Sequence, residues 1–242
     1  MFGKMSTAGK KTNVFTSGKG KFTVDSNVYK AKIKGVYAFA SGDGEGVTGI
    51  LDFELTKEDG TTRGYKETVS LVSKEGNTTY TDEKTGAELL LSGASLLAEI
   101  CAITCKQSPE NMESSQTMIE VYDFNARGNK PKEVTCLPGL KDKEICLAII
   151  EAEKYKNKKD GNEWVQTDEI KVENSIELVL QPETMKTLKE LQAKVEDPIA
   201  YNTWIEMWKD KVKEPYKKGG KKGKKSGSKP KEPELSAESF GF

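Results

Sequence analysis

The sequence predicts a mainly β protein with a few helices. Two observations lead to this fold class. Apolar and polar residues alternate with a period of two in several segments, and short glycine-containing turns separate the first three of them. Apolar residues recur at helical spacing in one central segment, and two prolines near the C-terminal end mark the starts of further helices. A chain of 242 residues has room for one large domain with extensions at its ends.

The first expected elements are three strands and a helix. The strands cover residues 28–39, 50–55 and 64–72. Short turns join them, so we expect an antiparallel meander. A longer connection then leads to a helix at 95–103, because the apolar residues of this segment have helical spacing.

The remaining expected elements are strands followed by two helices. The strands cover residues 118–124, 132–137, 144–155 and 163–172. Proline suits the first turn of a helix, and a proline precedes each of two helices that we expect over 183–195 and 199–212. Trp204 and Trp208 lie four residues apart in the last helix, and we expect them on its buried face.

Three strands, a helix and further strands follow one another in the five-stranded oligonucleotide-binding barrel, the OB-fold. The fold class that we expect is therefore mainly β with α: an OB-fold-like five-stranded antiparallel barrel with extra strands and C-terminal helices. Other mixed folds of strands and helices share this order, so the pattern leaves them open.

Charge divides the chain into three parts. Residues 1–21 hold five lysines and no acid, and residues 216–231 hold eight lysines and no acid. Without these and the three acids of the last 11 residues, 22–215 retains 25 basic and 35 acidic residues. We expect a flexible basic arm over 1–27, a folded domain over 28–215, and a disordered linker with an acidic, aromatic tip over 216–242.

The composition excludes several classes of site. The chain has no histidine, which rules out histidine-based acid/base catalysis, histidine-dependent nucleophiles and histidine-containing metal sites. Four cysteines lack the spacing of a zinc site, and we expect Cys101, Cys105, Cys136 and Cys146 to be buried free thiols. The sequence contains neither an apolar run of roughly 18 residues nor an N-terminal signal peptide. We therefore expect a soluble, non-enzymatic protein with no cofactor, no metal and no membrane contact.

Aromatic residues interleaved with basic residues are the positive signal. Nucleic-acid bases stack on aromatic faces while basic side chains follow the phosphates, although an ordinary sheet also alternates aromatic and lysine residues. Alternation places Lys30, Lys32 and Lys34 on one face of the first strand. The candidate DNA-binding residues are Lys30, Lys32, Lys34, Tyr37, Arg63, Tyr65, Lys66, Tyr80, Tyr122, Arg127, Lys130, Lys132, Tyr155, Lys156, Lys158 and Trp164.

Several segments together resemble the single-stranded DNA-binding proteins of tailed bacteriophages. They are residues 69–80, 82–86, 94–103, 119–126 and 144–150, and the likeness extends over about 30–215. The resemblance implies an OB-fold, sequence-independent binding of single strands and no catalysis. Proteins of this kind commonly end in an acidic tip with a terminal aromatic residue, and the chain ends similarly. By this likeness Glu234, Glu238, Phe240 and Phe242 would recruit replication or recombination proteins such as DNA polymerase.

The sequence therefore predicts a protein that coats and protects single-stranded DNA during phage replication, recombination and repair, in the cytoplasm of the infected bacterial host. Two alternatives remain open. One is a protein-interaction module without specific affinity for nucleic acid, and the other is an RNA-binding module. The oligomeric state is also open.

Overall fold

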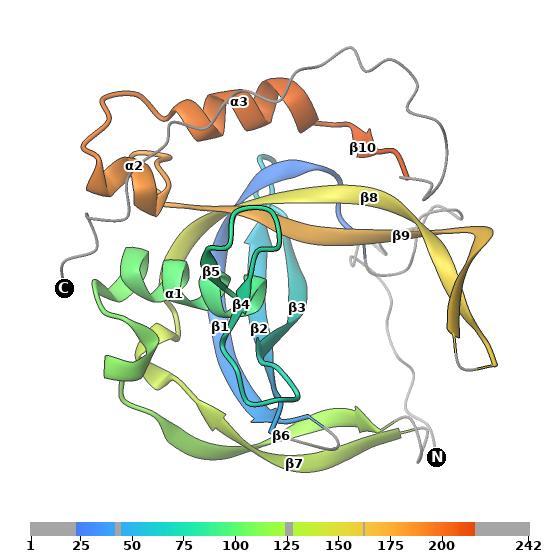
Figure 1. Cartoon of the computed structure of the whole chain (residues 1–242). Helices are drawn as coiled ribbons and strands as arrows, with labels where there is room; N and C mark the ends of the chain where they lie inside the picture. The colour runs from blue at the N-terminus through green and yellow to red at the C-terminus, as the bar shows by residue number, and fades with distance from the viewer. Residues whose placement is uncertain (1–22, 42–44, 124–127, 162, 216–242) are drawn as a thin grey trace, which may run out of the picture.

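The computed structural model describes residues 23–41, 45–123, 128–161 and 163–215, with the backbone alone at 121–123, 160, 163 and 164. Within these residues the chain is mainly β with a few helices, as the sequence predicts (Figure 1). Eight of the described strands form one sheet, and two more form a separate hairpin. The sheet is not closed into a barrel by hydrogen bonds.

The centre of the sheet is β1 (Asn27–Ala40). Along one edge it pairs with β2 (Val47–Thr56), which pairs in turn with β3 (Thr62–Val72), and both pairings are antiparallel. The expected meander of three strands is therefore confirmed. Alternate side chains of these strands are buried because only one face of the meander covers the core.

The other edge of β1 is shared by two strands. Its first half, Asn27 to Lys32, pairs with β8 (Glu144–Asp160), and its end pairs with β7 (Gly128–Cys136) at Tyr37 and Ala38. β8 forms a long hairpin with β9 (Glu163–Leu180), and β7 forms one with β6 (Ser115–Asp123). Figure 1 shows both hairpins extending from the body toward the same side.

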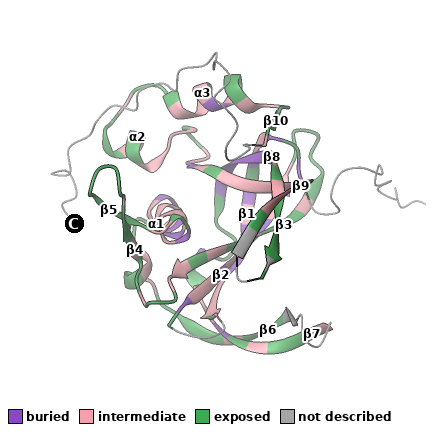
Figure 2. Cartoon of the chain, turned by 45° about the vertical axis from the view of Figure 1, so that its right-hand side comes forward, coloured by how far each residue is buried: buried purple, intermediate pink, exposed green. Residues whose placement is uncertain are grey.

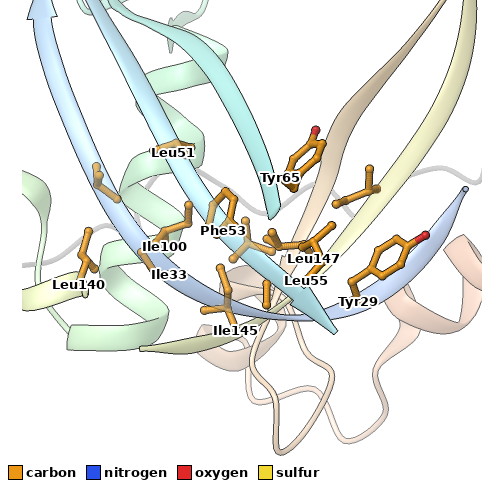
Figure 3. Close-up of a cluster of buried hydrophobic side chains, with 14 of the residues drawn as sticks. Tyr29, Ile33, Leu51, Phe53, Leu55, Tyr65, Ile100, Leu140, Ile145 and Leu147 are labelled. Carbon is orange, nitrogen blue, oxygen red and sulfur yellow. The ribbon is translucent and has the colours of Figure 1, made fainter. Parts of the chain in front are cut away.

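The main core lies between the meander, β8 and the helix α1 (Ser92–Cys105). Ile33, Leu51, Phe53, Ile100 and Leu147 are fully buried there, and Figure 3 shows how they meet. Full burial of such a side chain stabilises the fold by about 1.5–3 kcal/mol. This core fixes which face of β1 points outward.

A second, smaller core lies under the helix α3 (Ile199–Trp208). Trp204 is buried against Ala148 and Ile150 of β8, and Trp208 packs against the same cluster. The Trp204 Nε1 donates a hydrogen bond of 3.0 Å to Glu177. The expected buried face of this helix is confirmed, although the helix ends at Trp208 and the short strand β10 (Val212–Lys213) follows. No helix of the described part is long and apolar enough to span a membrane.

The helix expected over 183–195 is wrong. The chain turns after β9, with Met185 in the left-handed region, and the helix α2 covers only Leu188–Gln192. Its start is set by a capping box, in which Thr187 and Glu190 bond each other's backbone N–H groups. The helix therefore starts after Thr187, at the capping box, and not after Pro182. β9 also continues to Leu180 instead of ending at 172, since Val179 and Leu180 are buried.

The long connection after β3 contains a hairpin that the sequence pattern does not predict. It consists of β4 (Thr79–Thr81) and β5 (Glu88–Leu90). Figure 2 shows that it is largely exposed. Single turns of 3-10 helix cover Pro109–Asn111 (η1) and Pro138–Leu140 (η2).

Residues 23–26 bridge the open side of the sheet. The Arg63 guanidinium on β3 donates to the Thr23 carbonyl at 2.8 Å. On β9, the Asn174 side chain bonds both the N–H and the carbonyl of Val24 at 2.7 Å. Val24 is buried in the main core. These residues therefore belong to the folded body, not to the basic arm assigned to 1–27.

Candidate nucleic-acid interface

We call the face of β1 that points away from the main core its outer face. Most of the candidate residues that lie close together are on this face. Tyr29, Ala31 and Ile33 are buried against the core, whereas Lys30 and Lys34 are exposed and Lys32 is half-exposed. The expected placement of these three lysines on one face is therefore confirmed.

A β-bulge brings aromatic residues onto the same face. Ile33 lies opposite Phe53 of β2 and Gly35 lies opposite Asp52, so Lys34 is an extra residue in β1. Without it, simple alternation would turn Tyr37 toward the core. With it, Tyr37 lies opposite Ile50, on the outer face. The bulge therefore aligns lysines and aromatic rings along one strand.

The first half of this face is a basic patch, which we define as Lys30, Lys32, Lys34 and Lys141. Lys141 comes from the turn between β7 and β8, which is fixed to β1 by backbone bonds between Ile33 and residues 142 and 143 at 2.8 and 2.9 Å. At its centre, Lys32 Nζ lies 3.2 Å from the Asp142 carboxylate.

The pKa of Asp142 reflects the positive charge around it. The hydrogen bond from Lys32 is the main cause that lowers the pKa of Asp142, and the charges of Lys32, Lys141 and Lys34 add to it. Acids also border the patch, because Lys32 lies between Glu54 of β2 and Glu144 of β8. The positive charge is thus local, as a domain with an excess of acids requires.

The second half of the face is an aromatic patch, which we define as Tyr37, Phe39 and Ile50 with Lys132. The three apolar residues are half-exposed. Lys132 Nζ lies 4.0 Å above the centre of the Phe39 ring and donates to the Ala40 carbonyl at 3.2 Å. A cation over an aromatic face is favourable, and this one adds a positive charge to the aromatic patch.

Gly35 allows the Tyr37 ring to lie flat along the strand. A Cβ atom at Gly35 would be 2.2 Å from the Tyr37 Oη and 2.4 Å from its Cζ. Only a residue without a side chain fits beneath the ring. The glycine therefore positions the largest stacking surface of the outer face.

Other candidate lysines are engaged by acids. Lys66 of β3 lies beside the aromatic patch and pairs with Asp52 at 3.1 Å. On the β8–β9 hairpin, Lys156 pairs with Glu169 at 3.0 Å. Contact of these lysines with phosphate requires exchange of one anion for another, which reduces the gain in binding free energy.

Two candidates have structural positions instead. Tyr65 is only 6% exposed, stacks on Phe53 at a ring distance of 6.5 Å, and donates a hydrogen bond to Glu67. Burial is the main cause that raises the pKa of Tyr65. Tyr65 is therefore part of the core and is not available to stack on a base. Arg63 is held by the Thr23 carbonyl at the open side of the sheet.

The remaining candidates are scattered. Tyr80 lies on the β4–β5 hairpin, Lys130 is exposed on β7, and Tyr155 and Lys158 lie on β8. The side chains of Tyr122, Arg127 and Trp164, and the tip residues Glu234, Glu238, Phe240 and Phe242, lie outside the described residues. The structure adds three residues that are not among the candidates predicted from the sequence: Phe39, Ile50 and Lys141. Phe39 follows Tyr37 at the two-residue spacing of a strand, and this spacing could have identified it. Ile50 of β2 and Lys141 of the turn reach this face only through the fold, so no sequence pattern identifies them.

Of the four cysteines, Cys136 lies next to the aromatic patch, opposite Tyr37. Cys101 and Cys146 are buried, Cys105 and Cys136 are partly exposed, and all four are free. Burial is the main cause that raises the pKa of the Cys101 thiol to about 12. Within the described part of the chain, no group of three or more cysteine and acidic side chains could hold a metal ion.

Comparisons of the chain with protein families, curated proteins and solved structures found no match.

Proposed function

We propose that this protein is a non-enzymatic single-stranded DNA-binding protein that binds the strand along the outer face of β1. One observation carries the proposal: the bulge at Lys34 places the basic patch and the aromatic patch in line on one exposed face. The ten residues from Lys30 to Phe39 span about 30 Å at the rise of a β-strand. This length accommodates several nucleotides, as OB-folds do.

Each patch has a role in this mechanism. Lys30, Lys34 and Lys141 contact phosphates, which releases counterions and makes the affinity dependent on salt. The rings of Tyr37 and Phe39 stack on bases, which contributes about 1–3 kcal/mol per base without regard to sequence. Lys132, over Phe39, holds the phosphate that follows a stacked base.

The strand order supports an OB-like assignment within this proposal. β1 pairs with β2 on one edge and with β8 on the other, and β3 and β9 are the outer strands of this set. α1 follows β3 in the chain, as in an OB barrel. OB barrels are partly open, which agrees with the gap between β3 and β9 that residues 23–26 bridge.

The biological setting that we propose comes from the sequence resemblance. In it, the protein coats single strands during phage replication, recombination and repair. The acidic, aromatic tip with Glu234, Glu238, Phe240 and Phe242 recruits a partner such as DNA polymerase.

Fluorescence anisotropy with labelled 30-mers tests the proposal. We expect the protein to bind single-stranded DNA more tightly than a duplex of the same sequence and at least as tightly as single-stranded RNA. A clear preference for RNA would support the RNA-binding alternative instead. Absence of binding at low salt would leave the protein-interaction module.

A further inference from the structure

A shallow hollow of about 460 Å³ lies beside the β4–β5 hairpin, and its lining shares no residue with the basic patch or the aromatic patch. The turn at 73–77 and Leu91, just before α1, complete its wall. Its lining includes Ser73, Glu75, Asn77, Tyr80 and Glu88. The mechanism above uses none of these residues.

The wall of the hollow contains an exposed aromatic ring. Tyr80 is 49% exposed, and Leu89, opposite it on β5, is 41% exposed. A two-stranded hairpin that leaves its large side chains in water gains little stability from them. The Tyr80 ring is therefore accessible to a flat ligand from the hollow.

The polar groups of the hollow determine what can enter it. Glu88 accepts a hydrogen bond of 2.6 Å from the Thr79 hydroxyl. A hydrogen bond from Ser73 is the main cause that lowers the pKa of Glu75, and this carboxylate is ionised at neutral pH as exposed glutamates are. Two carboxylates repel phosphate but accept hydrogen bonds from N–H groups. Asn77 supplies both a donor and an acceptor.

The hollow adjoins the end of the outer face. Phe39 is followed by Ala40, the last residue of β1, and the next loop returns through a bond from Ser41 N to the Gly46 carbonyl at 2.9 Å. The same loop contacts the turn at 73–77, since Glu45 N donates to the Lys74 carbonyl at 3.2 Å. A strand that leaves the aromatic patch past Phe39 therefore meets this turn.

We infer that the hollow binds one unstacked cytosine of the bound strand. The base lies on Tyr80, its exocyclic amino group donates to Glu88 or Glu75, and Asn77 donates to its ring acceptors. Carboxylates accept from the cytosine N4 amino group, whereas thymine presents an oxygen at this position. The inference rests on the proposed function and adds a base preference to it.

Competition binding with oligonucleotides tests the inference. A dT30 strand is compared with the same strand carrying four cytosines in the middle. We expect the wild-type protein to prefer the cytosine-containing strand about fivefold, the effect of one charge-assisted hydrogen bond at a partly exposed site. Glu88→Gln and Glu75→Gln together should bring the ratio near one, because any gain in affinity from the loss of two negative charges is shared by both strands. Tyr80→Ala should weaken binding of the cytosine strand most.

Glu83→Gln is the matched control, because Glu83 lies on the same hairpin turn but does not line the hollow. It should keep the preference. A ratio of one in the wild type, a ratio that survives the double substitution, or a stronger preference for adenine would overturn the inference and leave the proposed function standing. Failure to bind dT30 at all would overturn the proposed function as well.

Discussion

Lys34, the extra residue in β1, decides which side chains reach the outer face. A period of two predicts the common face of Lys30, Lys32 and Lys34, and this prediction is confirmed. The same period would place Tyr37 on the opposite face. The rule fails because the bulge depends on the pairing with β2, which the sequence of β1 alone does not contain.

Gly35→Ala is expected to weaken binding of single-stranded DNA about three- to tenfold. The added Cβ would collide with the Tyr37 ring and displace it, with loss of part of one stacking contact. Stability should change little, because the Tyr37 ring is half-exposed and can move into solvent. Gly64→Ala is the control, since a Cβ at Gly64 on β3 has no neighbour within 4 Å. Equal affinities of the two variants would remove Tyr37 from the interface.

Glu67 makes the stability of the protein depend on pH. Burial is the main cause that raises the pKa of this carboxyl, and Glu173 adds to it, while the hydrogen bond from Tyr65 and the charge of Lys154 oppose it. The folded state then binds the proton more tightly than the unfolded state. The free energy of unfolding therefore falls as pH rises from the ordinary pKa of glutamate through the raised value.

Glu67→Gln should raise the melting temperature at pH 7 by a few degrees, because the amide keeps the acceptor for Tyr65 without a buried charge. The gain should shrink toward pH 4.5, where Glu67 is increasingly protonated. Thermal unfolding of both proteins across this range measures it. A constant difference at all pH values would show that the pKa of Glu67 is the same in the folded and unfolded states.

At the scale of elements, α1 packs closely against β3 at Gly93. A Cβ on this glycine would lie 2.4 Å from the Ser70 carbonyl oxygen and 2.7 Å from the Val69 Cβ. Alanine is the better helix former by about 1 kcal/mol, but the backbone of β3 leaves no room for it. The contact explains why the helix can pack so closely on the meander.

Gly93→Ala should lower the free energy of unfolding by about 1–3 kcal/mol, the usual cost of overpacking. Ser92→Ala, at the exposed first residue of the same helix, should be nearly neutral. Urea titrations of both variants measure the difference. A Gly93→Ala protein as stable as the wild type would mean that helix and strand can separate freely.

The sequence predicts most strands and both large helices, because alternation and helical spacing reflect burial on one face. Prediction from the sequence fails where a second local signal favours a different helix start, and where an element buries few side chains. Proline before 183–195 predicted a long helix, but the capping box of Thr187 and Glu190 starts a shorter one. The β4–β5 hairpin has no buried face and hence no pattern to detect. Similarly, burial of Tyr65 depends on its partner Phe53, which alternation in β3 cannot show.

At the scale of the molecule, the sheet depends on residues 23–26 to cover its open side. The Asn174 side-chain amide bonds both the N–H and the carbonyl of Val24, as the backbone of a neighbouring strand would. It also donates to the Ile150 carbonyl at 3.2 Å. Ser26 accepts a hydrogen bond of 2.8 Å from Glu151 N and is 1% exposed. Side chains thus replace the missing ladder between β3 and β9.

Asn174→Ala should destabilise the protein by about 2 kcal/mol, because it leaves the polar groups of a buried backbone segment without partners. Asn157→Ala, on the exposed part of the same hairpin, is the control. Both can be compared by chemical unfolding. Similar stabilities would indicate that the segment before β1 does not help to close the sheet.

The distribution of charge gives the most direct test of the central claim, that the outer face of β1 binds single-stranded DNA. The measurement is the slope of log K against log salt for a labelled oligonucleotide. Each phosphate contact with a single strand contributes about −0.7, so Lys30→Gln with Lys34→Gln should make the slope shallower by about 1.4. Lys189→Gln with Lys194→Gln also removes two positive charges, but near α2, and should leave the slope unchanged. A slope that both double variants share with the wild type would contradict the account.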